Sequence, residues 1–379
     1  MRTTRILALT AVGVLSGALT ACSGDKTDDA VAAAGTGGPI TVKASDDSCM
    51  VSRNTLDAGT TVFSITNGGS KVTEFYVYAP GDRVMAEVEN IAPGLSRELH
   101  VELPAGSYET ACKPGMIGKG IRNAFTVSGS AAPLAEDAKL KAATDNYSRY
   151  VKSQTAALET KTAEFVAAVK ANDVAKAKAL FPVSRTYWER IEPVAESFGD
   201  LDPKIDARVN DVEPGTEWTG YHRIEQALWV SNSTKGMEKY ADQLLADVKT
   251  VVAKAKTVKL TPLQLANGAK ELLDEVATGK VTGEEDRYSH TDLWDFQANV
   301  EGSQAAIQAL RPALQKRDAA LVTQLDTQFK AVFASLDKYR EGDGFKPYTA
   351  TEPEKKALGA VVDGLAEPVS KVAAVLAKK

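Results

Sequence analysis

The sequence predicts two domains of different class, an all-β domain followed by an all-α domain. The chain has 379 residues, more than one ordinary domain, and its 44% hydrophobic content is enough for two cores. Residues 40–128 contain the β-branched and aromatic runs typical of strands. After residue 131 the composition changes to Ala, Lys, Glu and Leu with a period of about 3.6 residues, which indicates helices. We therefore expect a β-sandwich over 40–128, a linker over 129–134 and a helical bundle over 135–379.

Charge and histidine content narrow the classes of partner and of metal site. A net charge of -5 over so long a chain leaves no basic stripe, so a nucleic-acid partner is not expected. The sequence contains only three histidines. Any metal site must therefore draw mainly on carboxylates or sulfur.

The first 22 residues have the pattern of a targeting signal. Arg2 and Arg5 precede an apolar stretch over 6–19 that is too short to span a bilayer comfortably. Residues 19–22, Leu-Thr-Ala-Cys, resemble the lipobox of bacterial lipoproteins. The resemblance implies that Cys22 becomes the lipidated N-terminus, anchored outside the cytoplasm to the cell membrane, at the cell surface or in the periplasm. Small residues also suit an ordinary signal-peptidase site, but lipidation better explains the cysteine. Residues 23–39, rich in Gly, Ala, Asp and Thr, then form a flexible tether.

Within the all-β domain, hydrophobic alternation predicts a small antiparallel sandwich. The Asn-Gly-Gly-Ser sequence at 67–70 is a turn between two strands, and a Gly-rich loop covers 113–120. The expected strands are 61–66, 74–78, 98–102, 107–111 and 122–127.

This sandwich resembles a cupredoxin. The loop before the last strand carries Cys-Lys-Pro-Gly-Met at 112–116, and Glu74 stands where a first ligand histidine would be. Both cupredoxin histidines are missing, which argues against an ordinary blue-copper centre. Two alternatives remain. Cys49, Glu74, Cys112 and Met116 form a modified site for copper or zinc, or Cys49 and Cys112 form a disulfide, the default outside the cytoplasm.

The remainder of the chain is expected to be helical, in antiparallel bundles joined by short connections. The expected helices are 136–171, 174–180, 184–198, 220–230, 237–256, 262–278, 292–314, 318–339 and 354–377.

One of these helices carries a potential pair of metal ligands. His222 and Glu225 are three residues apart, so they project from neighbouring turns of one face, about 60° apart. An imidazole and a carboxylate on one face can bind a cation once other helices bring oxygen ligands. The alternative is a partly buried histidine that is hydrogen-bonded within its own helix.

Three further clusters supply carboxylates. Glu189 lies opposite an apolar stripe, so periodicity alone indicates a solvated face, and Pro193 is expected to bend this helix. Asp206 belongs to an Asp-rich stretch typical of turns and caps. In the cluster 284–301, Asp292 and Asp295 share a helical face, although an N-cap explains part of that pattern. His290, in the same cluster, is a weaker candidate ligand, and sequence alone assigns none of these three a role.

At the level of whole segments the chain resembles the EfeO family. The segments that carry the resemblance are 187–198, 205–208, 220–228 and 283–304, and it covers nearly all of the mature chain. This family comprises extracytoplasmic iron-binding components of the EfeUOB uptake system, with a cupredoxin-like and an imelysin-like domain. The resemblance implies an iron site made by Glu189, Asp206, His222 and Glu225. It also implies two partners, a membrane iron permease (EfeU-like) and a haem peroxidase (EfeB-like).

The sequence therefore favours a protein that captures ferrous or ferric iron and passes it to the permease, without catalysis of its own. Copper in the cupredoxin-like domain would assist ferrous iron oxidation. An imelysin-type zinc metallopeptidase is the enzymatic alternative, but a His-Glu-x-x-His zincin has two imidazoles and a separate base, which this motif lacks. A surface protein that binds polysaccharide would need exposed aromatics. Trp188, Trp218, Trp229 and Trp294 are the candidates, although core packing suits them better.

The lipobox leads to a prediction about anchoring. The wild-type protein is expected to fractionate with membranes, because the lipid on Cys22 partitions into them. Replacement Cys22→Ala removes the acceptor, so the variant should leave the membrane fraction and keep its unprocessed mass. A variant that remains membrane-bound with unchanged processing would contradict lipidation.

Overall fold

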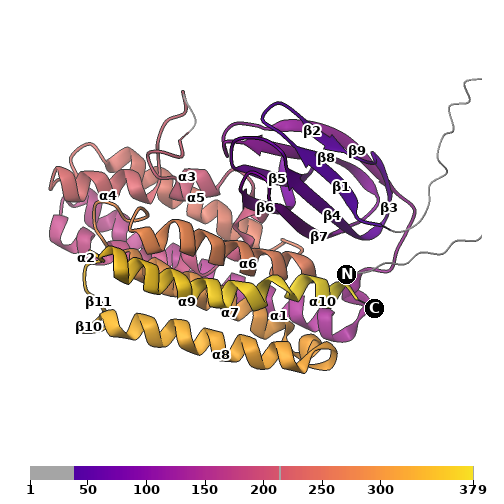
Figure 1. Ribbon diagram of the computed structural model, residues 1–379. Coiled ribbons are helices and arrows are strands. Elements are labelled where there is room, and N and C mark those ends of the chain that lie inside the picture. The colour runs from indigo at the N-terminus through magenta and orange to yellow at the C-terminus, as the bar shows by residue number, and fades with distance from the viewer. Residues whose placement is uncertain (1–37, 213–214, 379) are drawn as a thin grey trace, which may run out of the picture. The chain divides into compact units, whose positions relative to one another are not determined.

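Two sheets packed face to face are followed by a bundle of helices in the computed structural model, which describes residues 38–212 and 215–378 (Figure 1). The expected fold class, a β-sandwich preceding an all-α domain, is confirmed. Residues 39–379 form one compact unit. The signal sequence, Cys22 and all of the tether but its last two residues lie outside the described residues.

The strands form sheets with the orders β2-β1-β4-β7 and β3-β9-β8-β5-β6. Their bounds are β1 Ile40–Ala44, β2 Cys49–Val51, β3 Thr55–Asp57, β4 Gly59–Asn67, β5 Thr73–Ala79, β6 Arg83–Ile91, β7 Ser96–Leu103, β8 Gly106–Pro114 and β9 Ile121–Ser128. Apolar side chains of both sheets fill the space between them, and the ring of Phe63 contacts those of Phe75 and Phe125. The sandwich therefore has its own core.

Two features of the sandwich differ from the sequence prediction. The sheets are mixed rather than antiparallel, because β1 pairs with β4 and β3 pairs with β9 in parallel. Strands β1, β2, β3 and β6 were not predicted, and the longest of them is β6. Its first six residues run without alternation from exposed Arg83 into five consecutive buried residues, because α6 and the 3-10 helix Glu192–Phe198 contact it. A strand covered on both faces lacks the period of two that a half-exposed strand shows.

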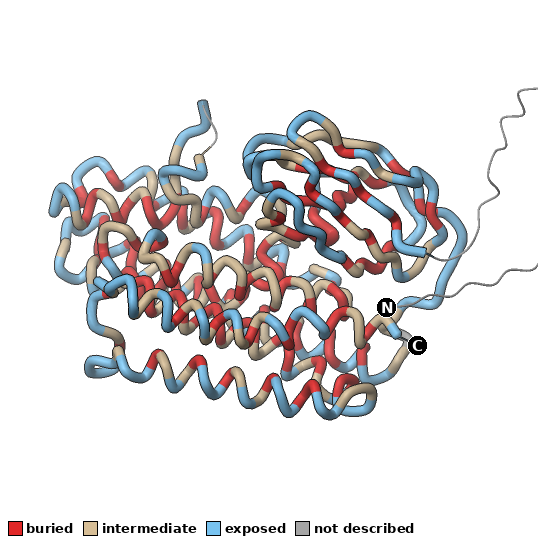
Figure 2. The backbone as a smooth tube through the Cα atoms, viewed as in Figure 1, coloured by how far each residue is buried: buried red, intermediate tan, exposed pale blue. Residues whose placement is uncertain are grey.

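The bundle is built from long helices that bury one face each. Their bounds are α1 Ala138–Lys170, α2 Val174–Glu189, α3 Asp202–Asp206, α4 Tyr221–Val230, α5 Glu238–Ala255, α6 Pro262–Thr278, α7 Asp292–Arg317, α8 Ala319–Leu336, α9 Glu352–Ser370 and α10 Val372–Ala377, with a small ribbon of β10 Arg340–Glu341 and β11 Gly344–Phe345. Buried residues follow the inward sides of the helices in Figure 2. Helix α6 also contacts β6 and β7, and Asn267 Nδ2 donates to the His100 carbonyl at 2.8 Å.

The helix predictions fail mainly around prolines. Helix α2 runs through Pro182, where the sequence suggested a break, and it ends at Glu189 instead of continuing to residue 198. Pro193 starts a separate 3-10 helix rather than bending a long helix, as its missing N–H allows at a helix start. Asp206 lies in the short helix α3, where a turn was expected.

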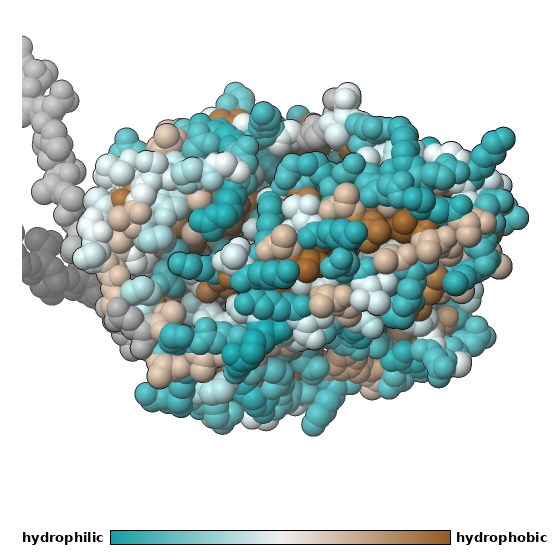
Figure 3. Space-filling model, turned by 180° about the vertical axis from the view of Figure 1, so that it is seen from behind, coloured by the Kyte–Doolittle hydropathy of each residue, from teal (hydrophilic) through white to brown (hydrophobic). Residues whose placement is uncertain are grey.

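No helix in the described ranges is both long and apolar enough to cross a bilayer. On the face seen in Figure 3 the surface is mostly hydrophilic, with apolar residues in small separate areas.

The close packing of α6 on the 3-10 helix leads to a stability prediction. A Cβ added at Gly268 would lie 1.8 Å from the Pro193 carbonyl oxygen, so the two elements would have to separate. We expect Gly268→Ala to lower the free energy of unfolding by about 1–3 kcal/mol in denaturant titration. Gly359→Ala on α9 is the matched control, because its Cβ would be 4.0 Å from the nearest side-chain atom. This control should raise stability by about 0.5–1 kcal/mol, and an equal effect of both variants would contradict the packing argument.

Candidate metal centre

Helix α4 buries His222 and Glu225 side by side, with 1% and 0% of their surfaces exposed. His222 Nδ1 lies 2.9 Å from Glu225 Oε2. The other carboxylate oxygen of Glu225 accepts the backbone N–H groups of Tyr288 and Ser289, at 3.1 and 2.8 Å, and the Ser289 hydroxyl at 2.9 Å. Glu225 is thus held rigidly, and it fixes the imidazole with Nε2 directed away from it.

A glycine allows a second element to reach that nitrogen. Gly220, with φ of 85°, precedes α4, and a Cβ there would lie 2.2 Å from the Ile205 carbonyl oxygen. Only glycine permits this approach of α3 to α4. It brings Asp206 Oδ1 to 3.8 Å from His222 Nε2.

The segment between α6 and α7 adds two more carboxylates. Glu285 Oε1 lies 3.5 Å from His222 Nε2, and Asp286 Oδ1 lies 3.8 Å from Nδ1. Three overlapping groups result, in each of which the candidate ligand atoms lie within 4.8 Å of one another. They are Asp206–His222–Glu285, His222–Glu225–Asp286 and Glu189–Glu192–Asp206.

The four residues expected from the sequence therefore lie in one cluster. The solvated-face interpretation of Glu189 is wrong, because this side chain is fully buried against α7, where Asn299 Nδ2 donates to its carboxylate at 2.9 Å. The hydrogen bond within α4 that was the alternative for His222 is present, but it uses Nδ1 alone. His222 Nε2 is buried without a hydrogen-bond partner among the described residues.

The third sequence cluster is divided by the structure. Asp292 and Asp295 are fully buried and belong to the site, whereas His290 is exposed. Thr291 occupies the N-cap of α7, but its side chain makes no capping bond and donates to Asp286 instead. The capping interpretation thus explains little of the pattern.

Arg185, on α2, is fully buried among the carboxylates. Its guanidinium lies 2.5 Å from Glu189, 3.2 Å from Asp295 and 3.4 Å from Glu285, and it also pairs with Asp206. A buried guanidinium with several carboxylate partners is a structural counter-ion that fixes their positions.

Lys280 is the second buried cation of this cluster. Its ammonium lies 3.4 Å from Glu189, 3.6 Å from Glu192 and 3.7 Å from Glu285. The carboxylates in contact with Arg185, Lys280 and His222 outnumber these cations, so the site retains excess negative charge. Such a site favours binding of a further cation.

Burial and neighbouring charge move the pKa values of these groups in different directions. Burial and Arg185 lower the pKa of His222, but the hydrogen bond to Glu225 and the nearby carboxylates of Glu285 and Asp206 outweigh them and raise it to about 9. Burial raises the pKa of Asp286 and Asp295 well above the usual range, and the attraction of Arg185 does not compensate. For Glu285 burial is outweighed by Lys280, His222 and Arg208, which hold its pKa well below the usual range.

Sequence reasoning assigned no role to Arg185, Lys280, Glu192, Glu285 or Asp286. A lysine and an arginine in an Ala- and Lys-rich helical region look like surface residues. The acidic run at 284–286, close before the face of Asp292 and Asp295, was the available signal for the two carboxylates of that segment.

In the sandwich, the structure resolves the two alternatives for the cysteines. Cys49 and Cys112 form a disulfide, so their thiolates are not available to a metal. Glu74 pairs with Lys113 at 3.8 Å, and Met116 is 39% exposed. The proposed copper or zinc site of Cys49, Glu74, Cys112 and Met116 is therefore wrong for this disulfide-bonded form.

The link between Glu225 and His222 can be tested by NMR titration of the metal-free protein. His222 should titrate near pH 9, and His100, whose pKa burial lowers, below 6.5. The protonated His222 thus stabilises the fold fully below pH 6.5, and this contribution is lost as the pH rises through 9. Glu225→Gln removes the anionic acceptor and should lower the pKa of His222. The exposed Glu238→Gln is the control, and an unchanged His222 titration in Glu225→Gln would contradict the assignment.

Comparison with known proteins agrees with this architecture. The model of the imelysin family matches residues 143–372, and that of the cupredoxin-like domain matches residues 11–123. The proteins named iron uptake system component EfeO of Escherichia coli strain K12 and of Shigella flexneri are each 42% identical to this chain over 347 residues. The matches cover 89% of this chain and 91% of each relative. The chain belongs to the EfeO family, in which a cupredoxin-like domain precedes an imelysin domain.

Proposed function

We propose that this protein captures iron outside the cytoplasm and passes it to a membrane permease. One observation carries the proposal: His222 Nε2, buried without a hydrogen-bond partner in the described chain, faces the carboxylates of Asp206 and Glu285. An unpartnered buried nitrogen is costly unless a ligand satisfies it. The names of the relatives identify iron as the ion to test first.

The proposed ligands are His222 Nε2 with carboxylate oxygens of Asp206 and Glu285, and Glu189 borders this set through its own group with Asp206 and Glu192. Glu225 belongs to the same site, and its contacts favour the role of holding the imidazole over that of a direct ligand. Iron accepts imidazole nitrogen and carboxylate oxygen in either oxidation state, and the same donors tolerate zinc. Asp286 Oδ1 and Asp295 Oδ1 are also buried without a hydrogen-bond partner among the described residues, so the site offers further oxygen atoms.

A cavity of about 490 Å³, here called the entrance cavity, supports access to this site. It reaches from Glu74 and Glu89 of the sandwich to Asp206 and Glu285, and much of its lining is acidic. An acidic cleft raises the local concentration of cations. The sandwich thus serves as one wall of the route, without a metal at its cysteines.

Handover follows from the same chemistry. Protonation of His222 and of the carboxylates competes with iron, so a lower local pH promotes release. A lipid on Cys22 would hold the protein beside a permease of the EfeU type. A haem peroxidase of the EfeB type is the proposed source of oxidation chemistry, because the disulfide leaves no copper site at the cysteines.

Neither alternative function is favoured by the geometry. In a zinc peptidase Glu225 would act as ligand or base, but three hydrogen-bond donors and His222 occupy its oxygens. A polysaccharide cleft would need exposed tryptophans. Trp188 is fully buried, and Trp218, Trp229 and Trp294 are partly buried.

The proposal predicts that iron affinity depends on the buried site. In calorimetric titration with ferric citrate, His222→Ala and Glu285→Ala should each weaken binding at least about 10- to 100-fold, since each removes a bond to the metal. Exposed His290→Ala is the matched control and should bind like wild type. Unchanged affinity in His222→Ala would refute the site, and casein zymography lost in the same variant would support a peptidase.

Iron binding should also depend on pH. His222 must lose its proton to bind, and its pKa is about 9. Each pH unit below 9 should therefore weaken binding by about tenfold. Iron binding should also release a proton, and calorimetry in buffers of different ionisation enthalpy measures this release. The pH range from about 6 to 8 lies below the raised pKa of His222, so the imidazole is protonated there before iron binds. Affinity that does not change with pH in this range would contradict a role for this imidazole.

A further inference from the structure

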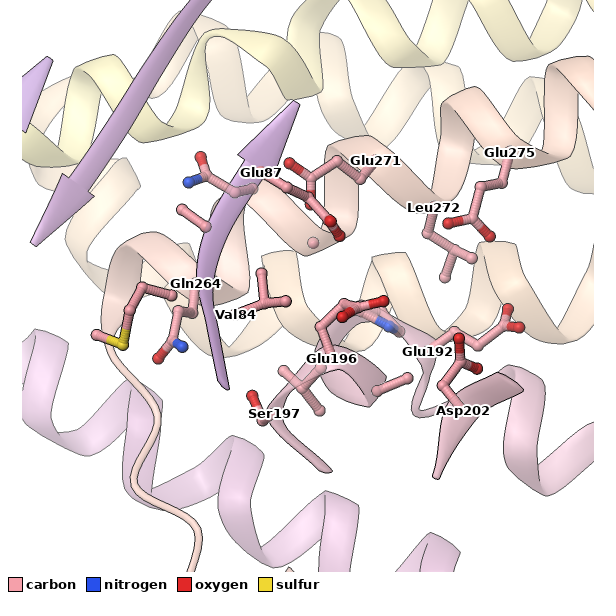
Figure 4. Close-up of a pocket in the computed structure, with 17 residues that line it drawn as sticks. Val84, Glu87, Glu192, Glu196, Ser197, Asp202, Gln264, Glu271, Leu272 and Glu275 are labelled. Carbon is pink, nitrogen blue, oxygen red and sulfur yellow. The ribbon is translucent and has the colours of Figure 1, made fainter. Parts of the chain in front are cut away.

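A second cavity lies where the sandwich meets the bundle, away from His222. It measures about 80 Å³ and is here called the inner cavity. Strand β6, the 3-10 helix Glu192–Phe198, α3 and α6 line it (Figure 4). One water occupies about 30 Å³ of liquid, so the inner cavity has room for an ion with a few waters.

The lining of the inner cavity is acidic. Its carboxylates come from Glu87, Glu192, Glu196, Asp202, Glu271 and Glu275. No lysine, arginine or histidine is among the described residues that line it. Figure 4 shows Glu87 on β6 and Glu271 on α6 directed into the same space, with Glu196 facing them from the 3-10 helix.

A second observation points to a ligand. Only 7% of the surface of Glu87 is exposed, and its Oε2 has no hydrogen-bond partner in the described part of the chain. The carboxylates of Glu196, Glu271 and Glu275 likewise form no ion pair within 4 Å there. Burial raises the pKa of Glu87 well above its usual range, with Glu196 adding to the effect, so only protons or a cation can relieve the repulsion.

We propose that the inner cavity is a second cation site, which takes a hard divalent cation such as Mn²⁺ or Fe²⁺ with part of its water shell, held by the carboxylates of Glu87, Glu196 and Glu271 partly through these waters. Oxygen ligands without nitrogen or sulfur suit such ions. The site differs in this respect from the His222 centre, which includes an imidazole.

The inner cavity also lies on a route to the His222 centre. Glu192, Glu196, Asp202 and Glu275 line both the inner and the entrance cavity, and the latter reaches Asp206 and Glu285. The second site therefore holds the cargo ion before it enters the His222 centre, and in this respect the inference rests on the proposed function.

Calorimetric titration of the full chain with Mn²⁺ tests the proposal. Wild type should bind two ions, and the double variant Glu87→Gln/Glu271→Gln should bind one. His222→Ala should also bind one, at the carboxylate site. Glu238→Gln/Glu341→Gln, which removes two exposed carboxylates, is the matched control and should still bind two.

The outcomes separate the two claims. The second site would be overturned if the double variant still bound two ions. It would also be overturned if wild type bound a single ion and His222→Ala abolished this binding. Both results would leave the proposed function intact. Two ions in His222→Ala would refute the His222 centre instead. If the double variant does not fold, wild-type crystals soaked in Mn²⁺ decide. An anomalous peak among Glu87, Glu196 and Glu271 supports the second site, and a peak at His222 alone overturns it.

Discussion

The mutual repulsion of buried carboxylates around Arg185 is the constraint on which the rest of the site depends. Separate elements deliver these groups: α2, α3, the segment before α7, and α7 itself. Buried charges of one sign are tolerated only with close counter-ions, and breaking such a pair typically costs about 3–5 kcal/mol. Arg185 and Lys280 therefore fix the arrangement, and the proposed cation would balance the negative charge that they leave uncompensated.

The proposed function depends on how the imidazole of His222 is positioned among these carboxylates. The three donors on Glu225 fix its carboxylate, the carboxylate fixes His222, and Nε2 faces Asp206 and Glu285. An acceptor on one ring nitrogen orients the other towards a metal and raises its basicity. The same acceptor raises the pKa of His222, so the feature that would prepare the proposed site for iron would also make binding sensitive to acid.

Local patterns in the sequence predicted the fold class and part of this site. The i, i+3 spacing of His222 and Glu225 requires only one helix. Helix α6 was predicted with its observed bounds, and the structure shows a local signal there, a Thr261 cap followed by Pro262. Long-range contacts defeated the same reasoning. The period of α2 placed Glu189 in solvent, since it cannot show that Asn299 of α7 lies across from this side chain. Strand β6 lost its alternation to α6, and the counter-ion role of Arg185 exists only once five carboxylates surround it.

The central claim is that iron binds at His222 Nε2 between the carboxylates of Asp206 and Glu285. An anomalous difference map at the iron absorption edge, from crystals of the iron-loaded wild-type protein, tests it most directly. The account predicts a peak in bonding contact with His222 Nε2 and with oxygens of both carboxylates. A peak near the Cys49–Cys112 disulfide, or none within reach of His222, would contradict it.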